Sequence, residues 1–258
     1  MLKLENLSIQ FGGLKAVQKL DLEITNGMIF GLIGPNGAGK TTVFNMLTGV
    51  YRPTEGKIFA LGKETIGLKP WEITRSGIAR TFQNIRLFKD LSVLDNVRIA
   101  QDQSSEWRYH GLISSIYRTK AFVQDEESKH LSATELLGIF GLEERKTELA
   151  KNLPYGDQRR LEIARAMATG AKLLLLDEPA AGMNSSETEK LMQTIRMVRE
   201  EFGLTIFLIE HHMQLVMGIC ERIAVLDYGV KIAEGTASEI QNNPKVIEAY
   251  LGKSFIEK

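Results

Sequence analysis

The fold is decided by the stretch MIFGLIGPNGAGKTT, residues 28–42. Its first part is a short, continuously apolar run, which is typical of a strand buried on both faces of a parallel sheet. Its second part, GPNGAGKTT, matches the pattern G-x-x-x-x-G-K-[ST] in full, and a helical pattern follows over residues 40–47. A strand, a glycine-rich loop and a helix in this order predict a phosphate-binding loop rather than a purely structural glycine turn.

The residue types of this loop suit the binding of nucleotide phosphates. Its glycines allow positive φ and close backbone approach, so that successive N–H groups can point at phosphate oxygens. Lys40 can reach the β- and γ-phosphates, and the hydroxyl of Thr41 can bind Mg²⁺. The candidate nucleotide-binding residues of the loop are Gly34, Pro35, Asn36, Gly37, Ala38, Gly39, Lys40, Thr41 and Thr42.

A second apolar run, LLLLDEP (173–179), ends in two carboxylates. In a parallel α/β sheet the ligand lies beyond the carboxyl ends of the strands. Asp177 is therefore predicted to hold Mg²⁺ through water, and Glu178 to orient and deprotonate an attacking water. For this run considered alone, the alternative to a metal site and a catalytic base is that the two acids cap a turn at Pro179. Buried acids also need a positive group nearby, and the polar loop that opens the stretch 153–179 supplies none.

A third apolar run, TIFLIE (205–210), is followed by His211. The same geometry predicts that His211 lies near the γ-phosphate and senses it, although a lone histidine is usually structural. Helical patterns at 157–168, 186–201 and 212–219 lie between the apolar runs. Helices that alternate with buried strands predict an open α/β sheet.

Other segments predict antiparallel pairing. Residues 2–10 and 57–62 alternate apolar and polar side chains, which is typical of antiparallel strands with one solvated face. Residues 222–235 predict a hairpin that turns at Tyr228 and Gly229.

Residues 84–152 show several helix signals and no convincing strand, and so predict a helical insertion. One of these signals is a capping box formed by Ser92 and Asp95. Within the insertion, residues 106–120 carry three aromatic and three basic side chains. This segment is either a loop packed by its own aromatic rings or a docking element close to a membrane.

The composition excludes several classes of protein. The 32 basic and 32 acidic residues balance, so no basic excess marks a general nucleic-acid binder. No apolar run approaches the roughly 20 residues that cross a bilayer, and the N-terminus lacks a secretory core. The single cysteine, Cys220, excludes an internal disulfide and suits a reducing compartment, where its ordinary role is that of a small buried residue.

Taken together, these motifs resemble the nucleotide-binding subunit of an ATP-binding cassette (ABC) transporter over nearly the whole chain. Phe11 matches the aromatic residue that stacks on adenine, and Gln83 matches the glutamine that joins the core to the helical subdomain. LPYGDQRR (153–160) matches the signature loop, LDEP (176–179) the second phosphate motif, and His211 the switch histidine.

The resemblance implies an α/β fold: a P-loop NTPase core with a mostly parallel sheet, an antiparallel β subdomain and an inserted α-helical subdomain. Residues 1–258 are then a single ABC ATPase domain. In it, 1–83 and 153–258 form the nucleotide-binding core with the antiparallel β subdomain, and 84–152 form the helical subdomain.

The resemblance also implies ATP and Mg²⁺ as cofactors and assigns roles to single residues. Glu178, His211 and Gln83 are the implied catalytic residues. Thr41, Gln83 and Asp177 are the implied metal ligands.

In this family two subunits pair head to tail, and the signature loop of one contacts the nucleotide of the other. Tyr155, Gly156 and Asp157 are the residues expected at that contact. Gly156 allows close approach to phosphate, and Asp157 can cap the helix that runs to residue 168. The loop departs from the usual L-S-G-G-Q, because Pro154 cannot supply a serine hydroxyl to the phosphate.

Five stretches narrow the resemblance to the LivG-type ATPases of branched-chain amino acid importers. They are 77–101, the aromatic insertion that follows it, LPYGDQRRLEIAR (153–165), DEPAAGMN (177–184) and the tail 242–252. Importers of urea or short amides are the alternative. A soluble ABC ATPase that acts on DNA or ribosomes is a further alternative, although such proteins carry coiled coils, duplicated cassettes or basic tails. A GTPase would need an N-K-x-D motif, which the sequence lacks.

The implied partners follow from the same resemblance. They are a second homologous ATPase subunit, in a heterodimer or a homodimer, and membrane permease subunits that dock near Gln83 and Phe88, where ordinary helix packing is the alternative for Phe88. A substrate-binding protein takes part indirectly, and no nucleic acid is expected. The chain is then a peripheral subunit at the cytoplasmic face of the membrane.

Overall fold

The computed structural model describes residues 1–101 and 120–251. They form two compact units, one made of Met1–Gln83 with the described chain from Lys172 onward, and the other of Asn84–Ala171. The aromatic and basic segment 106–120 lies outside the described residues, except for the backbone of Lys120.

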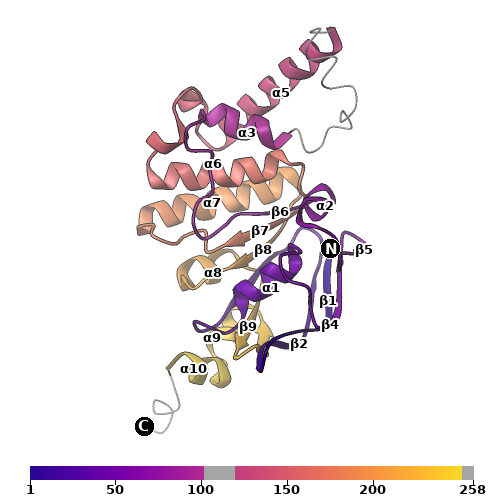
Figure 1. Ribbon diagram of the computed structural model, residues 1–258. Helices are drawn as coiled ribbons and strands as arrows, with labels where there is room; N and C mark the ends of the chain where they lie inside the picture. The colour runs from indigo at the N-terminus through magenta and orange to yellow at the C-terminus, as the bar shows by residue number, and fades with distance from the viewer. Residues whose placement is uncertain (102–119, 252–258) are drawn as a thin grey trace. The chain divides into compact units, whose positions relative to one another are not determined.

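The first unit is built on a six-stranded sheet with the strand order β10-β9-β3-β8-β7-β6 (Figure 1). Its five strands other than β10 pair in parallel, as predicted, and β10 pairs antiparallel with β9. The bounds are β3 (Ile29–Ile33), β6 (Ile78–Arg80), β7 (Leu173–Asp177), β8 (Thr205–Ile209), β9 (Arg222–Asp227) and β10 (Val230–Gly235).

The three apolar runs of the sequence are the central strands of this sheet. All five residues of each of β3, β7 and β8 are buried, which is why these strands show no alternation. The helices that follow them are α1 (Lys40–Leu47), α7 (Ser185–Phe202) and α8 (Met213–Ile219). Asn184 caps α7, because its side chain accepts from the N–H of Glu187 while the Glu187 carboxylate accepts from the N–H of Asn184.

A second, antiparallel sheet in the same unit has the order β2-β1-β4-β5. Its strands are β1 (Leu2–Phe11), β2 (Leu14–Ile24), β4 (Glu55–Ala60) and β5 (Lys63–Glu64), and the short helix α2 (Pro70–Arg75) follows them. One apolar core joins both sheets around α1, whose Phe44 is fully buried (Figure 1). The predicted strand over 57–62 ends at Ala60, since Leu61 and Gly62 adopt positive φ and turn the chain into β5.

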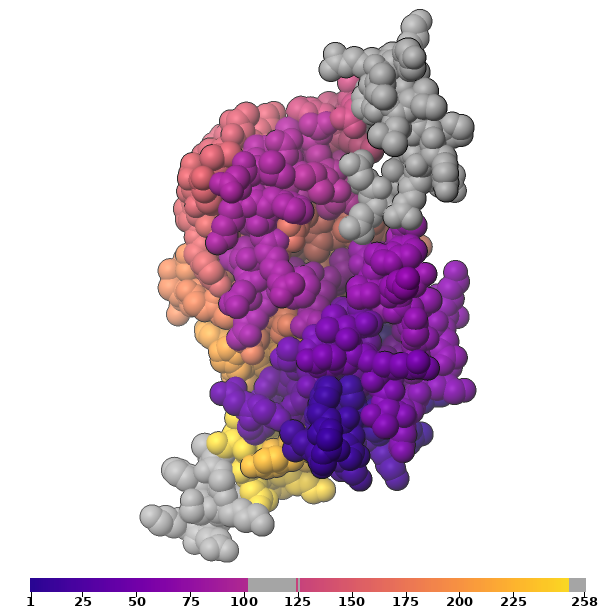
Figure 2. Space-filling model, viewed as in Figure 1, coloured from indigo at the N-terminus to yellow at the C-terminus, as the bar shows by residue number. Residues whose placement is uncertain are grey.

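The C-terminal part of the described chain lies against the N-terminal strands. The predicted hairpin turn at Tyr228 and Gly229 is present, with φ of 44° and 79°. Beyond it, Lys231 Nζ donates to the carbonyl oxygen of Asp21 in β2 at 2.7 Å, and Figure 2 shows indigo and yellow parts of the chain side by side on one surface. The unit ends with α9 (Ala237–Gln241) and α10 (Pro244–Leu251).

The second unit is helical, as the patterns over 84–152 predict. It contains α3 (Val93–Gln101), α5 (Lys120–Ile139), α6 (Tyr155–Ala168) and the short 3₁₀ segments Glu143–Arg145 and Ala150–Asn152. Because α6 packs on α3 and α5, this compact unit extends to Ala171, whereas the sequence placed the end of the helical insertion at 152.

Two local features bear on the sequence analysis. Ser92 Oγ accepts from the N–H of Asp95 at 3.0 Å and donates to the Asp95 carboxylate, so the pair caps α3. Cys220 is buried beside Gly31, and burial raises the pKa of its thiol well above the usual value. Among the described residues, no helix has both the length and the apolarity required to cross a bilayer.

The core predicts a large effect for one aromatic residue. Phe207 is fully buried, and its ring lies 5.7 Å from that of Phe30 and 5.1 Å from that of Phe44. We expect Phe207→Ala to lower the free energy of unfolding by about 3–5 kcal/mol in urea titrations, since it removes a ring and leaves a cavity. Phe202→Ala is the control: this ring is 46% exposed, and its loss is expected to cost about 0.5 kcal/mol or less. Equal destabilisation by the two substitutions would contradict the core assignment.

Candidate active site

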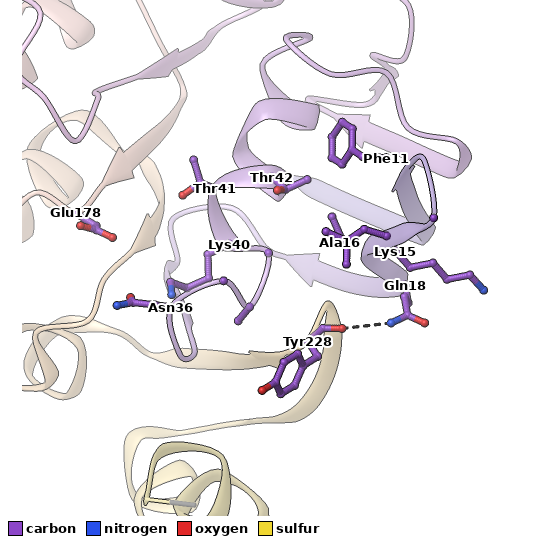
Figure 3. Close-up of a pocket in the computed structure, with 15 residues that line it drawn as sticks. Phe11, Lys15, Ala16, Gln18, Asn36, Lys40, Thr41, Thr42, Glu178 and Tyr228 are labelled. Atoms are coloured by element: carbon purple, nitrogen blue, oxygen red, sulfur yellow. Dashed lines mark hydrogen bonds between the residues drawn. The ribbon is translucent and has the colours of Figure 1, made fainter.

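A pocket of about 680 Å³ lies over the glycine-rich loop, and all of its lining residues belong to the first unit (Figure 3). Side chains or backbone from the end of β1, the start of β2, the loop before α1, the end of β7 and the β9–β10 turn surround it. The lining residues are Phe11, Gly13, Leu14, Lys15, Ala16, Gln18, Asn36, Gly37, Ala38, Gly39, Lys40, Thr41, Thr42, Glu178 and Tyr228.

The loop holds its shape because two of its glycines sit where no side chain fits. A Cβ on Gly34 would lie 2.0 Å from the carbonyl oxygen of Leu226, and one on Gly39 would lie 2.5 Å from that of Ala16. Gly39 is also the N-cap of α1 and has no side chain to accept from the first-turn amides. The helix therefore presents its N–H groups and positive dipole end to a ligand, which favours an anion.

Lys40 is buried at the floor of the loop. Its ammonium donates to the carbonyl oxygens of Gly34 at 2.7 Å and Pro35 at 3.0 Å. Burial lowers the pKa of Lys40, and the nearby carboxylates of Glu178 and Asp177 oppose that shift. An anionic ligand in the pocket would supply the charge that the carbonyl oxygens only partly provide.

Phe11 and Glu178 lie at opposite ends of the pocket, with Lys40 between them (Figure 3). The Phe11 ring is 44% exposed and meets the ring of Tyr51 edge-on at 5.2 Å. The exposed part of this ring lines the pocket, where a planar base could stack on it.

Three of the residues that the sequence analysis singled out for catalysis meet at the other end. Gln83 Nε2 donates to Glu178 Oε2 at 2.7 Å, and His211 Nδ1 lies 3.6 Å from the same oxygen. Glu178 has φ of 47°, a left-handed conformation that costs a non-glycine residue about 1–2 kcal/mol. Strain of this kind is concentrated at functional sites.

Asp177 has the positive partner that its burial requires. Arg80, at the end of the neighbouring strand β6, pairs with it at 2.6 Å between Nη2 and Oδ2. Sequence reasoning missed Arg80, because it lies 97 positions from Asp177 along the chain and only the pairing of β6 with β7 brings the two together.

The predicted metal ligands Thr41, Gln83 and Asp177 offer a hydroxyl, an amide and a carboxylate oxygen, which are donors that suit Mg²⁺. In residues 1–101 and 120–251, no group of three or more histidine, cysteine or acidic side chains is arranged to hold a metal ion. The donor set therefore fits Mg²⁺ that arrives with the oxygens of a bound phosphate.

The sequence analysis also missed a role for Glu210, which is fully buried. Its carboxylate accepts from the N–H of Ala180 at 2.8 Å and from the N–H groups of His211 and His212 at 2.8 and 2.9 Å. The segment after Glu178 and the segment that carries His211 are thus held by one side chain. A buried acid directly before a histidine at a strand end was the available signal.

The residues of the expected partner contact lie in the second unit, at the start of α6. The prediction that Asp157 caps this helix is wrong, because α6 begins two residues earlier, at Tyr155. Asp157 lies inside the first turn, and its carboxylate pairs with Arg160 and, at 3.5 Å, with Arg145. Pro154 occupies the N-cap position and has no side-chain group that can accept from the first-turn amides.

Comparison with protein families gives two matches. Residues 17–181 match the family described as ABC transporter, and residues 230–256 match the one described as branched-chain amino acid ATP-binding cassette transporter. The high-affinity branched-chain amino acid transport ATP-binding protein LivG of Salmonella typhimurium is 48% identical over 254 residues, which cover 98% of each chain.

Solved structures agree with these matches. The ADP conformation of MJ1267, an ATP-binding cassette of an ABC transporter, aligns with a TM-score of 0.84 at 29% identity and covers 98% of this chain and 99% of that one. A dimeric post-hydrolysis state of the cassette MJ0796 bound to ADP and Pi aligns with a TM-score of 0.76 at 27% identity, over 92% and 99% of the two chains.

These comparisons confirm the resemblance and the fold class that the motifs predict. The match over 98% of both chains shows that this chain belongs to the ABC transporter family, as one of its ATP-binding subunits.

Proposed function

We propose that the chain hydrolyses ATP at a head-to-tail subunit interface and thereby drives the uptake of branched-chain amino acids through a membrane permease. The proposed ATPase activity is supported by the pocket, which is lined by both the phosphate-binding loop and the strand-end acid Glu178. The solute rests on the names of the relatives and on the C-terminal match over residues 230–256.

In this proposal the loop binds the triphosphate through its backbone amides, and Lys40 exchanges its two carbonyl partners for phosphate oxygens. Phe11 stacks on the adenine at the far end of the pocket. Thr41, Gln83 and Asp177 hold Mg²⁺, which neutralises charge on the phosphates when it is bound. Such binding positions the γ-phosphate toward the end of the pocket at which Glu178 lies.

Glu178 is the proposed base. Its carboxylate can accept the proton of a water that attacks the γ-phosphate, and the Gln83 amide fixes the orientation of that carboxylate. His211, 3.6 Å from Glu178, is proposed to contact the γ-phosphate and to orient the same water.

The interface requires a second ATPase subunit, in a heterodimer or a homodimer. Tyr155, Gly156 and Asp157 are proposed to contact the nucleotide of that subunit through the N-terminal end of α6. The dimeric state of MJ0796 supports this arrangement. The other partners are membrane permease subunits and, indirectly, a substrate-binding protein, and nucleic acid is not among them. The chain acts as a peripheral subunit at the cytoplasmic face of the membrane.

The base-stacking role of Phe11 predicts a defined loss of affinity. Phe11→Ala is expected to weaken ATP binding by about 1–3 kcal/mol, which is the range for the stacking of a nucleobase on an aromatic side chain. Isothermal titration of the purified chain measures it. Phe88→Ala, which removes a ring of similar exposure (48%) from the second unit, is the control and is expected to leave the affinity unchanged. An unaltered affinity in Phe11→Ala would show that the base does not stack there.

The role of Glu178 as base predicts a trapped complex. Glu178→Gln keeps the shape and removes the proton acceptor, so the variant is expected to bind ATP but to lose hydrolysis by about 10²–10⁴-fold. Two copies should then stay closed on ATP, which size-exclusion chromatography with light scattering detects as a nucleotide-dependent dimer.

The same variant tests the transport function. In cells that lack the gene, the wild-type chain is expected to restore uptake of radiolabelled leucine, isoleucine and valine, and Glu178→Gln is expected to restore none. Rapid ATP hydrolysis by the variant within the assembled transporter would contradict its role as base. Restoration of urea or amide uptake instead would contradict the proposed solute.

A further inference from the structure

The side chains of Arg80 and Asp177 form a buried ion pair. They are only 6% and 5% exposed, and Arg80 Nη2 lies 2.6 Å from Asp177 Oδ2. Loss of one partner would leave a buried charge without compensation. The pair also neutralises one of two consecutive carboxylates, since Glu178 follows directly.

The second arm of the same guanidinium reaches the helix of the phosphate-binding loop. Arg80 Nη1 donates to Asn45 Oδ1 at 2.8 Å and to Thr48 Oγ1 at 3.4 Å, both in α1. Asn45 lies one helical turn beyond Thr41, on the same side of α1. One planar group therefore spans the end of β7 and the helix that carries Thr41.

Two aromatic rings further restrict the guanidinium. Its carbon lies 5.5 Å from the centroid of Phe44 and 5.1 Å from that of Phe82. A planar guanidinium can stack on rings while it donates along two edges, whereas the point charge of a lysine ammonium cannot maintain both contacts.

We propose that Arg80 is a positioning residue, which holds Asp177 at a fixed place relative to Thr41 so that their oxygens together form the protein's side of the Mg²⁺ site. The proposal rests on the proposed function, because Mg²⁺ enters with ATP. Asp177 Oδ2 stays on Arg80, and the other carboxylate oxygen serves the metal. Groups that bond to a metal's ligands set its affinity in this way.

Arg80→Lys tests the proposal, since it keeps the positive charge and removes the two-armed bridge. Binding of ATP with an N-methylanthraniloyl label is measured by fluorescence, once in EDTA and once in saturating Mg²⁺. The affinity in EDTA is expected to stay within about twofold of wild type, and the gain in affinity on adding Mg²⁺ is expected to shrink about tenfold. Electron paramagnetic resonance of Mn²⁺ with ATP should show the same loss. An undiminished gain would overturn the proposal.

Two further variants guard against trivial outcomes. Asn45→Leu keeps the Arg80–Asp177 pair and removes the hydrogen bond from Arg80 to Asn45 in α1. A smaller gain in ATP affinity on adding Mg²⁺ is therefore expected for this variant too. If Arg80→Lys does not fold, the result for Asn45→Leu tests the proposal. Arg75→Lys is the matched control: its guanidinium lies 5.2 Å from the ring of Trp71 in α2, and the gain should equal that of wild type.

The wild-type chain separates failure of this proposal from failure of the proposed function. If wild type binds labelled ATP with a Mg²⁺ gain and both site variants match it, only the role of Arg80 is wrong. If wild type itself binds no labelled ATP, the proposed function is wrong.

Discussion

The arrangement of the site depends on the carboxyl edge of the parallel sheet, where buried strands stop and their backbone no longer pairs. The strands β3, β7 and β8 run in the same direction, so their ends meet at one edge and bring the loop of α1, the Asp177–Glu178 pair and the His211 segment together. Every residue of the three strands is buried up to that edge. Charge is therefore concentrated where backbone amides and helix ends can compensate it.

Three of the charged groups gathered at this edge are also balanced by a partner of opposite charge or by backbone dipoles. Asp177 is balanced by a guanidinium, Glu210 by three backbone N–H groups, and Lys40 by two carbonyl oxygens. Glu178 instead faces an exposed amide from Gln83 at 2.7 Å and the imidazole of His211 at 3.6 Å. The carboxylate proposed for proton transfer thus has exposed partners, whereas the partner of Asp177 is buried.

Features encoded in contiguous residues could be predicted from the sequence. The phosphate-binding loop, the three apolar strands and the β9–β10 hairpin each have a sequence pattern that can be recognised within about a dozen consecutive residues. β2 was missed because Lys19 adopts a φ of 44° and the pairing with β1 shifts register, which breaks the alternation. β6 was missed because three residues are too few for a pattern.

Contacts between distant parts of the chain could not be predicted. Arg80 meets Asp177 across 97 positions of sequence, and no spacing rule connects them. The Asp157 prediction was wrong for a related reason: the N-cap at Pro154 and the first-turn residue Asp157 are only three positions apart, and the pairing of Asp157 with Arg145 depends on tertiary packing. Strand ends could be assigned to one edge, but the partner of each charge there could not.

The burial of Cys220 has a practical consequence for studying subunit association. It is the only sulfhydryl in the sequence, and the thiolate that reacts with maleimides is disfavoured at its site. The native chain therefore offers maleimides no readily reactive thiol. A cysteine introduced at one exposed position would accept a dye or spin label alone, and the separation of two protomers could be followed through a catalytic cycle without deleting a native residue.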